Sequence, residues 1–342
     1  MRKKNKRNLR NTEIMEYGIF HRDLLIQLRN RIPKNSKLVT KLVEILSLER
    51  EAVYRRLRQD VYFTIEEISV ITKEFNISLD SILGANARTT QLFRFQSGKD
   101  ENPIKIDYLL LEECLQVIKE VASDSKGKIS LVTNLLPRLL FTGFIHIFRF
   151  YVFKWRYYST PVDQTLPYHE IVLSDRIIQM VEDIFTYSKN IKNCYYILDN
   201  RIFHNFVNDV NYFNSIRLIR DEDVLLIKNE LFRFLNYMEE IAAKGFADNP
   251  SNKVFIYISD TCIDSSYSFV NSKFSSRFAL IWSFIFNSVL IFEEETLKMM
   301  EYRIRSKIRT STLLSVTGEK QRTLYFEAQR KIVEQLCCSY TE

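Results

Sequence analysis

The sequence is poor in residues that break regular structure. It has only 7 glycines and 6 prolines in 342 residues, against 46% apolar residues, 25 phenylalanines and 18 tyrosines. This composition excludes an intrinsically disordered protein, because enough large apolar side chains are present to offset the entropy of ordering. Phosphate loops and nucleophile turns built on glycine are also missing, since no GxxxxGK[ST], GxGxxG or GxSxG segment occurs. We expect a folded chain of two or three domains.

Cysteine and histidine are few and scattered. No CxxC, HxxxH or HExxH spacing occurs, so neither a disulfide framework nor a metal site is expected, and no cofactor is expected either. The adjacent pair Cys337 and Cys338 is compatible with a redox switch, and also with two small residues at a helix end. The remaining residues of these two types are Cys114, Cys194, Cys262, His21, His146, His169 and His204.

Long hydrophobic runs are absent as well. The two longest, 139–153 and 278–292, contain polar residues and are shorter than the roughly 20 residues that a spanning helix needs. The basic start MRKKNKRNLRNTE leads into polar residues, unlike a secretory signal peptide. We therefore expect a cytoplasmic protein with no membrane partner.

Positive charge is concentrated at one end of the chain. Residues 1–90 contain 18 basic and 11 acidic side chains, whereas residues 91–342 contain 31 of each. A cationic N-terminal unit suits a nucleic-acid backbone, because neutralising phosphates releases counterions and supplies much of the affinity. Six of these basic residues lie within the first ten, where a solubilising tail explains them equally well.

Residues 20–84 show the spacing of five short helices. Apolar residues recur at helical intervals in HRDLLIQLRNRI and in SKLVTKLVEILSL, where Ser36 is a candidate N-cap. The segment EREAVYRRLRQ follows almost at once. Thr64 and Glu67 predict a capping box for a fourth helix, and NISLDSIL predicts a fifth. The short connections between these segments predict a compact bundle.

This order of helices resembles the lambda-repressor-like helix-turn-helix family, also called the xenobiotic-response-element family of bacterial regulators. The family's turn pattern would fall on Val43, Ser47 and Val53, and TIEEISVITKEFNISLDSIL is similar to its fourth and fifth helices. Ser47 stands where glycine is usual, and Arg56 stands where an apolar residue is usual. The resemblance covers about a fifth of the chain and implies a five-helix DNA-binding domain at 20–84.

The resemblance places 49–59 as the recognition helix, which enters the major groove in this family. With Ala52, Val53 and Leu57 toward the core, helical spacing turns the polar side chains outward, where they would meet base edges and phosphates. An ordinary solvated helix face is the alternative. Two lysines before the preceding helix are candidate contacts to the phosphate backbone of DNA. The candidate DNA-binding residues are Arg50, Glu51, Tyr54, Arg55, Arg58, Gln59, Lys34 and Lys37.

The rest of the chain is expected to be mainly helical. The polar segment 85–103 is interpreted as a linker, and 1–19 as a basic tail. Alternating segments from Lys253 onward predict a small antiparallel sheet near 253–287. Helical patterns cover 104–123, 130–158, 171–190, 200–217 and 221–243 and return after the sheet.

The predicted fold class is therefore mainly α with a small antiparallel β-sheet (α+β), and 104–342 forms a dimerisation or sensor domain. This region resembles the uncharacterised C-terminal halves of some Bacteroidetes-type regulators, which implies no activity.

No catalytic arrangement is evident in 104–342. Carboxylates cluster at Asp221–Asp223 and Glu293–Glu295, where both groups begin predicted helices and complement the helix dipole. An aromatic series is compatible with nucleic-acid stacking or a ligand pocket, and also with core packing or a dimer face. Its members are Phe144, Phe148, Tyr151, Phe153, Trp155, Tyr157 and Tyr158.

We expect a sequence-specific transcriptional regulator without enzymatic activity that binds double-stranded DNA. A homodimer is expected, because one small module buries little surface and two linked modules gain from effective concentration. The C-terminal domain leaves room for an effector ligand or protein. The alternative is a non-enzymatic adaptor or antitoxin-like scaffold, and an enzyme in 104–342 is the third possibility.

Overall fold

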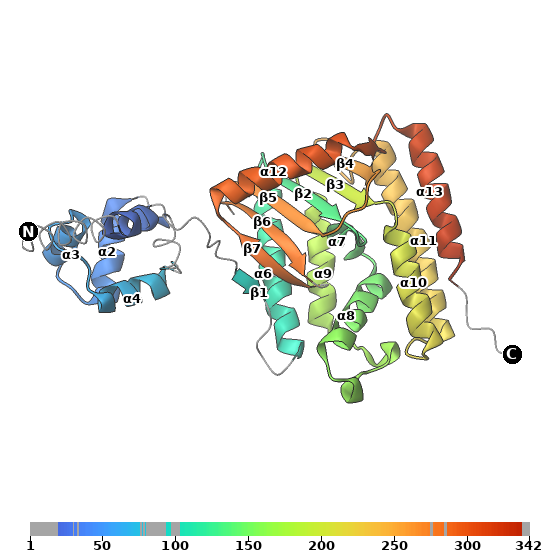
Figure 1. Ribbon diagram of the computed structural model, residues 1–342, viewed down its shortest axis with the longest axis horizontal. Coiled ribbons are helices and arrows are strands. Elements are labelled where there is room, and N and C mark those ends of the chain that lie inside the picture. Colours follow the sequence, from blue (N-terminus) through green and yellow to red (C-terminus); the bar gives the residue numbers. More distant parts are fainter. Residues whose placement is uncertain are drawn as a thin grey trace, which may run out of the picture. The chain divides into compact units, whose positions relative to one another are not determined.

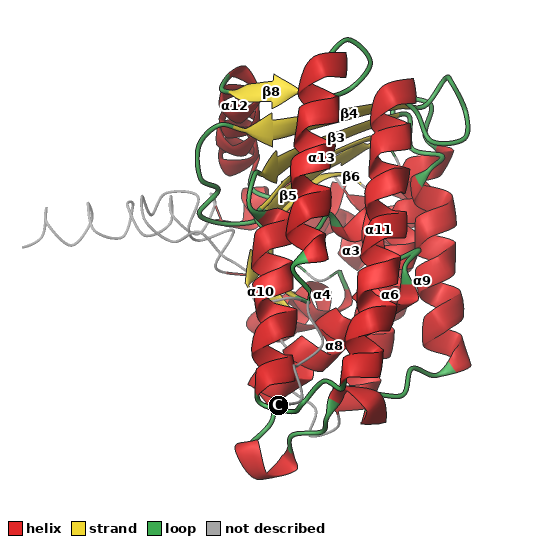
Figure 2. Cartoon of the chain, turned by 90° about the vertical axis from the view of Figure 1, so that its right-hand side faces the viewer, coloured by secondary structure: helices red, strands yellow, loops and turns green. Residues whose placement is uncertain are grey.

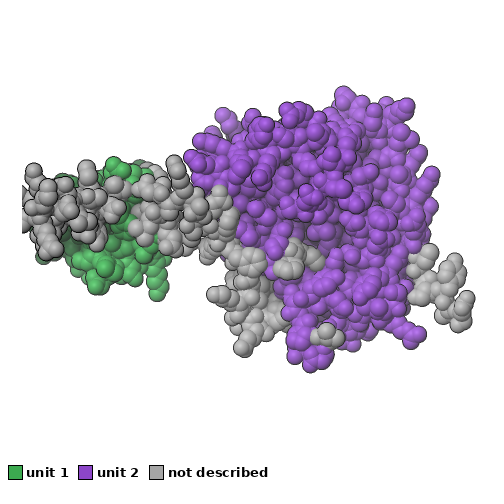
Figure 3. Space-filling view, in the orientation of Figure 1, with its two compact units in different colours: residues 1–92 green, residues 93–342 purple. Residues whose placement is uncertain are grey.

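The computed structural model describes residues 20–79 except 30, 33, 76 and 78, residues 94–96, and residues 103–336 except 274–275 and 284–285. The chain divides into two compact units, Met1–Leu92 and Phe93–Glu342 (Figure 3). This boundary falls inside the segment interpreted as a linker. The basic tail, Gly84 and the pair Cys337 and Cys338 lie outside the described residues.

Unit 1 is a small bundle of helices. Residues 20–29 are helical, and α2 (Asn35–Leu46), α3 (Arg50–Leu57) and α4 (Ile65–Glu74) follow. Apolar side chains spaced three and four residues apart place one face of each helix in a common core. The buried residues of this core are Leu24, Leu25, Leu28, Leu38, Val39, Leu42, Val53, Leu57, Phe63, Ile71, Phe75 and Ile77.

The predicted helix caps of unit 1 are partly correct. The capping box of α4 is confirmed, since the Thr64 hydroxyl accepts a hydrogen bond from the Glu67 amide at 3.3 Å and the Glu67 carboxylate accepts one from the Thr64 amide at 3.0 Å. Ser36 as N-cap of α2 is wrong, because the helix begins at Asn35 and Lys34 occupies the N-cap. Ser78, the expected cap of the fifth helix, lies outside the described residues.

Unit 2 contains an eight-stranded mixed sheet with the order β1-β7-β6-β5-β2-β3-β4-β8 (Figure 1). The central strands β2, β3 and β4 are parallel, and each of the other pairings is antiparallel. The strands are β1 (Arg94–Gln96), β2 (Lys128–Thr133), β3 (Asn193–Asp199), β4 (Lys253–Ser259), β5 (Tyr267–Ser272), β6 (Ser276–Ser283), β7 (Asn287–Ile291) and β8 (Ser311–Leu313).

The expectation of a mainly α fold with a small antiparallel sheet near 253–287 is wrong. The sheet extends from β1 to β8, and its parallel centre includes β2, which falls at the start of the helix expected over 130–158, and β3, for which no strand was expected. Both strands are covered on two faces, so NCYYILD lacks the polar alternation of a half-exposed strand, and KISLVT shows it only over its first four residues.

Helices cover both faces of this sheet (Figures 1 and 2). On one face, Ile129, Tyr196 and Ile256 of the parallel strands pack into the large core that most helices share, whereas on the other face Val132 and Ile197 pack against α12. The helices are α6 (Pro103–Ser123), α7 (Arg138–Phe141), α8 (Ile145–Ser159), α9 (Asp175–Ser188), α10 (Ile202–Ser215), α11 (Asp221–Lys244), α12 (Glu294–Arg309) and α13 (Glu319–Glu334), with 3-10 turns at Val162–Gln164 and Tyr168–Glu170.

Two acidic clusters begin helices, as predicted. The first turn of α11 contains Asp221–Asp223, and Gly245 ends that helix in the left-handed conformation with φ 74°. The carboxylate of Glu293 is the N-cap of α12 and accepts from the amides of Glu295 and Thr296. Helix capping therefore accounts for both clusters.

The aromatic series of α8 lies mostly in the core of unit 2. Tyr151 stacks on Phe141 at 4.6 Å, and Phe153 makes an edge contact with Phe213 at 4.9 Å between ring centroids. Tyr158 is the outward member and is 61% exposed. Core packing is thus the role that the structure gives to most of this series. Among the described helices, none has the length and apolar character that a bilayer span requires.

Candidate nucleic-acid interface

The turn between α2 and α3 depends on one residue in an unusual conformation. Ser47 follows α2 with φ 52° and ψ 37°, the left-handed region. Leu48 then packs partly against the core, and Glu49 is extended as N-cap of α3. Glycine, which the sequence resemblance led us to expect here, adopts positive φ without steric cost.

One face of α3 is fixed in the core, and the opposite face is open. Val53 is fully buried and Leu57 is 5% exposed, so the rotation of the helix is set by these two contacts. The helix is shorter than the predicted 49–59, because Leu57 is its last residue and Arg58 and Gln59 form the turn that follows. Five of the six candidates on this segment are exposed: Arg50, Glu51, Arg55, Arg58 and Gln59.

The sixth candidate, Tyr54, is half-buried and packs against the core of unit 1. Its ring therefore contributes to packing, and only part of it faces outward. Helical periodicity does not reveal this, because a residue beside Val53 lies at the edge of the buried face.

Two candidates of opposite charge are paired with each other. The Arg58 guanidinium lies 2.8 Å from a carboxylate oxygen of Glu51 and 3.1 Å from one of Asp60, and these hydrogen bonds raise the pKa of Arg58. Arg50 donates to the Thr40 hydroxyl at 3.3 Å. Arg55 has no ion-pair partner within the described part of unit 1. Arg55 is thus the cation of α3 that is most available to an external anion.

The Arg56 side chain links α3 to α4. Its guanidinium makes two hydrogen bonds to the Glu67 carboxylate, at 2.8 and 2.7 Å, and a third to the Ala52 carbonyl at 3.2 Å. Both side chains of the pair are only 14% exposed. An ion pair therefore occupies the position where the family pattern has an apolar residue. An arginine at a core-facing position followed by a capping-box glutamate is the sequence signal for it.

The two candidate lysines lie at the start of α2. Lys34 is the N-cap, its side chain makes no capping hydrogen bond, and the first turn contains no acidic residue. Lys37 is exposed in that first turn. A helix N-terminus with free amides and cationic side chains is a favourable place for a phosphate group.

The carboxyl ends of the parallel strands of unit 2 form a second candidate site, because ligands of α/β sheets bind at this edge. Here the connection between β4 and β5 covers them. The buried Asp199 accepts from the amides of Ile263 and Arg201 at 2.8 and 2.9 Å, and the Ser266 hydroxyl lies 3.0 Å from that of Thr133. These polar groups hold the connection in place, which accounts for their burial without a reaction.

Histidines do not assemble a site. His21 is 2% exposed in unit 1 and contacts the rings of Tyr62 and Phe63, and burial lowers its pKa. His204 is exposed on α10. Within 20–79, 94–96 and 103–336, apart from the undescribed positions, no three His, Cys, Asp or Glu side chains are placed to hold a metal ion.

No family model, curated protein or solved structure matches the chain.

Proposed function

We propose that the chain is a sequence-specific DNA-binding transcriptional regulator that reads the major groove with α3 and acts as a homodimer. The observation that carries this proposal is the division of α3 into two faces. Val53 and Leu57 hold the helix in the core, and Arg50, Glu51 and Arg55 remain exposed on a cationic module. A recognition helix needs a fixed rotation and long hydrogen-bonding side chains on its free face.

The exposed side chains have distinct roles in this proposal. Arg55, which has no ion-pair partner among the described residues, is the first choice for a bidentate pair with guanine. When DNA binds, Glu51 leaves Arg58 and accepts a hydrogen bond from a cytosine amino group, and Arg58 then contacts a phosphate. Lys34 and Lys37 contact phosphates of the DNA backbone at the start of α2.

The direct test is selection of bound sequences from a random double-stranded DNA pool with the full-length protein. A motif with two inverted half-sites is the expected result, because two-fold symmetry of a dimer is mirrored in its operator. Recovery of DNA without any enriched motif would contradict sequence reading. It would favour the adaptor or scaffold alternative.

Substitutions in α3 and in the turn after it then test the assignment of residues. Arg55→Ala should weaken binding to the selected site by about fivefold or more, since a bidentate arginine–guanine pair contributes about 1–3 kcal/mol. Arg58→Ala should weaken it less, because in the free protein Arg58 must first leave Glu51 and Asp60. Arg22→Ala, an exposed arginine on the first helix, is the matched control. Equal DNA affinities of Arg55→Ala and Arg22→Ala in a gel-shift titration would show that Arg55 does not contact DNA.

A further inference from the structure

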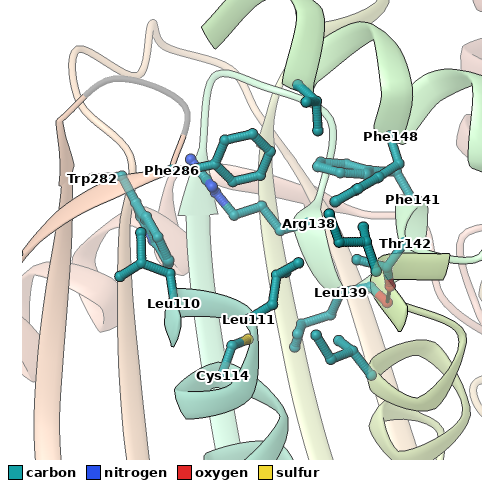
Figure 4. Close-up of a pocket in the computed structure, with 13 residues that line it drawn as sticks. Leu110, Leu111, Cys114, Arg138, Leu139, Phe141, Thr142, Phe148, Trp282 and Phe286 are labelled. Carbon is teal, nitrogen blue, oxygen red and sulfur yellow. Dashed lines mark hydrogen bonds between the residues drawn. The ribbon is translucent and has the colours of Figure 1, made fainter. Parts of the chain in front are cut away.

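The two faces of the sheet in unit 2 are covered differently. On one face, the helices of the large core enclose a cavity of about 90 Å³ with predominantly apolar walls (Figure 4). Arg138, the charged residue of its lining, lies against the rings of Trp282 and Phe286 and has a further interaction within the protein, so its charge is already engaged. The other face, on which α12 lies, has a different character (Figure 1).

Helix α12 covers only part of that other face. Residues aligned across β2, β3 and β4 share one face of the sheet, and alternate residues along each strand share it too. In the row against α12, Val132 and Ile197 are fully buried. In the next row toward the strand starts, Tyr195 is aligned with Phe255, and both are only half-buried. The helix therefore leaves this aromatic pair partly exposed.

Tyr195 and Phe255 form a stacked column with a lysine. Their ring centroids are 4.7 Å apart with an interplanar angle of 17°, and Lys128 Nζ lies 4.7 Å from the centroid of the Tyr195 ring. Lys128 begins β2 and belongs to the first row of this face, in which Asn193 of β3 aligns it with Lys253 at the start of β4. The first two rows thus combine parallel rings with ammonium groups.

Two more lysines lie at the same edge of the sheet, beside a buried carboxylate. Asp124, which is 2% exposed, accepts from the amides of Lys126 and Lys273 at 2.9 and 2.7 Å and so joins the turn before β2 to the end of β5. Lys126, Lys253 and Lys273 are exposed. In the part of the chain that the structure describes, none of these lysines nor Lys128 forms an ion pair. We call these four residues the lysine edge.

The lysine edge keeps a net positive charge. Hydrogen bonds from the two amides lower the pKa of Asp124, so its carboxylate is ionised and offsets one of the four ammonium groups. The remaining charge favours an anionic ligand, and several separated cations favour one whose negative charge is repeated along its length. A chain of phosphates meets this requirement.

The stacked rings narrow the choice among polyanions. Proteins that bind single strands combine a basic path for the phosphates with aromatic side chains on which the bases stack. A duplex exposes only the edges of its bases in the grooves, so its bases cannot stack on rings that belong to a sheet. An anionic membrane supplies charge but no planar ring. A single strand therefore matches both the lysine edge and the aromatic pair.

We propose that this face of unit 2 binds a single strand of nucleic acid, with its phosphates along the lysine edge and its bases stacked on the aromatic pair. Lys128 occupies the Tyr195 end of the column, so Phe255 is the ring on which a base continues the stack. The site lies in unit 2 and goes beyond the duplex recognition proposed for unit 1. Either property can fail alone.

Binding is measured by fluorescence anisotropy with the full-length protein and labelled oligo(dT) and oligo(rU) of about ten nucleotides, a length within the usual site sizes. Phe255→Leu keeps an apolar side chain but removes the flat ring, and it should weaken binding about fivefold or more. Phe255→Tyr, which keeps the ring, should bind like the wild type. Lys253→Gln should reduce the slope of the logarithm of the binding constant against that of salt concentration by about 0.7.

A second pair of a lysine and an aromatic ring provides the matched control. Lys119 Nζ of α6 lies 5.0 Å from the ring centroid of Tyr187 on α9, which is 38% exposed. Tyr187→Leu and Lys119→Gln should leave both affinity and salt slope unchanged. A duplex of the same length should bind equally to the wild type and Phe255→Leu, because its bases are not free to stack.

Crosslinking locates the bound base without any variant. A strand that contains 5-iodouridine is irradiated in complex with the wild-type protein, and the crosslinked peptides are identified by mass spectrometry. Crosslinks in β3 or β4 are expected. Crosslinks confined to residues 1–92 would overturn the proposal even if the strand binds.

Two further results would also contradict a single-strand site. One is the absence of saturable binding of both strands up to about 100 μM protein, the weak end of non-specific affinities. The other is a loss of affinity in Lys253→Gln with none in Phe255→Leu, which would mean that the lysine edge attracts any polyanion, an anionic membrane included.

Discussion

Ser47 occupies the left-handed region at the turn before α3, where a side chain costs roughly 1–2 kcal/mol. Ser47→Gly should therefore stabilise unit 1 by about 0.5–1 kcal/mol, after allowance for the greater freedom of glycine in the unfolded chain. Urea denaturation of the fragment 1–92, which has its own core, measures this change in the free energy of unfolding.

Ser69→Gly is the matched control for that experiment. Ser69 is an exposed residue inside α4, where glycine costs roughly 0.5–1 kcal/mol relative to better helix formers. The two serine-to-glycine changes should thus have opposite signs. Destabilisation by both would show that the turn does not need positive φ at Ser47.

His21 should make the stability of unit 1 depend on pH. Neither ring nitrogen has a hydrogen-bond partner among the described residues, and burial together with the nearby charge of Arg56 lowers the pKa of the folded state. Below the unfolded pKa of about 6.5, the unfolded chain takes up a proton that the folded chain does not. Stability should therefore fall as the pH drops below about 6.5, by at most about 1.4 kcal/mol per pH unit for this group.

His21→Phe should remove that contribution, because phenylalanine fills the site beside Tyr62 and Phe63 without titrating. The measurement is urea denaturation of wild-type and variant fragments 1–92 between pH 5 and about 8. Parallel stability curves over this range would contradict the assignment to His21.

At the scale of elements, the junction of α3 and α4 depends on Glu67, which both closes the capping box and pairs with Arg56. Glu67→Gln keeps a side chain that can complete the box but loses the charge, so it should cost about 1–2 kcal/mol of unfolding free energy. Glu67→Ala loses both functions and should cost about 1 kcal/mol more. Thr64→Ala, which affects the cap alone, is the control. Equal unfolding free energies for wild type and Glu67→Gln would show that the ion pair contributes nothing.

Element prediction from this sequence succeeded where one face of a segment is polar. The amphipathic segments of unit 1 predicted α2, α3 and α4 within a few residues, and the outward face of α3 followed from the same spacing. It failed for β2 and β3, which are covered on both faces, so that β3 contains no polar alternation and β2 contains it over only four residues. Parallel pairing also joins residues far apart in sequence, such as Ile129 with Cys194, which no local pattern reveals.

The candidate site shows the same limit. Exposure of Arg50 and Arg55 follows from helical spacing, but the pairing of Arg58 with Glu51 depends on where α3 ends. The Arg56–Glu67 ion pair joins residues across the loop between two helices. Such contacts are set by tertiary packing, and they decide which cations remain available.

For the whole molecule, the excess of positive charge ends close to the boundary between the two units. Unit 1 has its own core, and the excess of positive charge lies in residues 1–90, whereas the neutral remainder contains the sheet and its helices. This arrangement suits a cationic reading module joined to a body with another task. A homodimer would present two copies of every phosphate contact to one operator.

That doubling gives a measurable prediction for Lys37, which is exposed in the first turn of α2. The logarithm of the binding constant falls with the logarithm of salt concentration by about 0.9 for each phosphate neutralised. Lys37→Ala should therefore reduce the steepness of this plot by about 1.8 for a dimer and weaken binding to selected and random DNA alike. Lys73→Ala, an exposed lysine of α4, should leave the slope unchanged. A reduction of only about 0.9 would mean that one copy binds, and an unchanged slope would remove Lys37 from the backbone contacts.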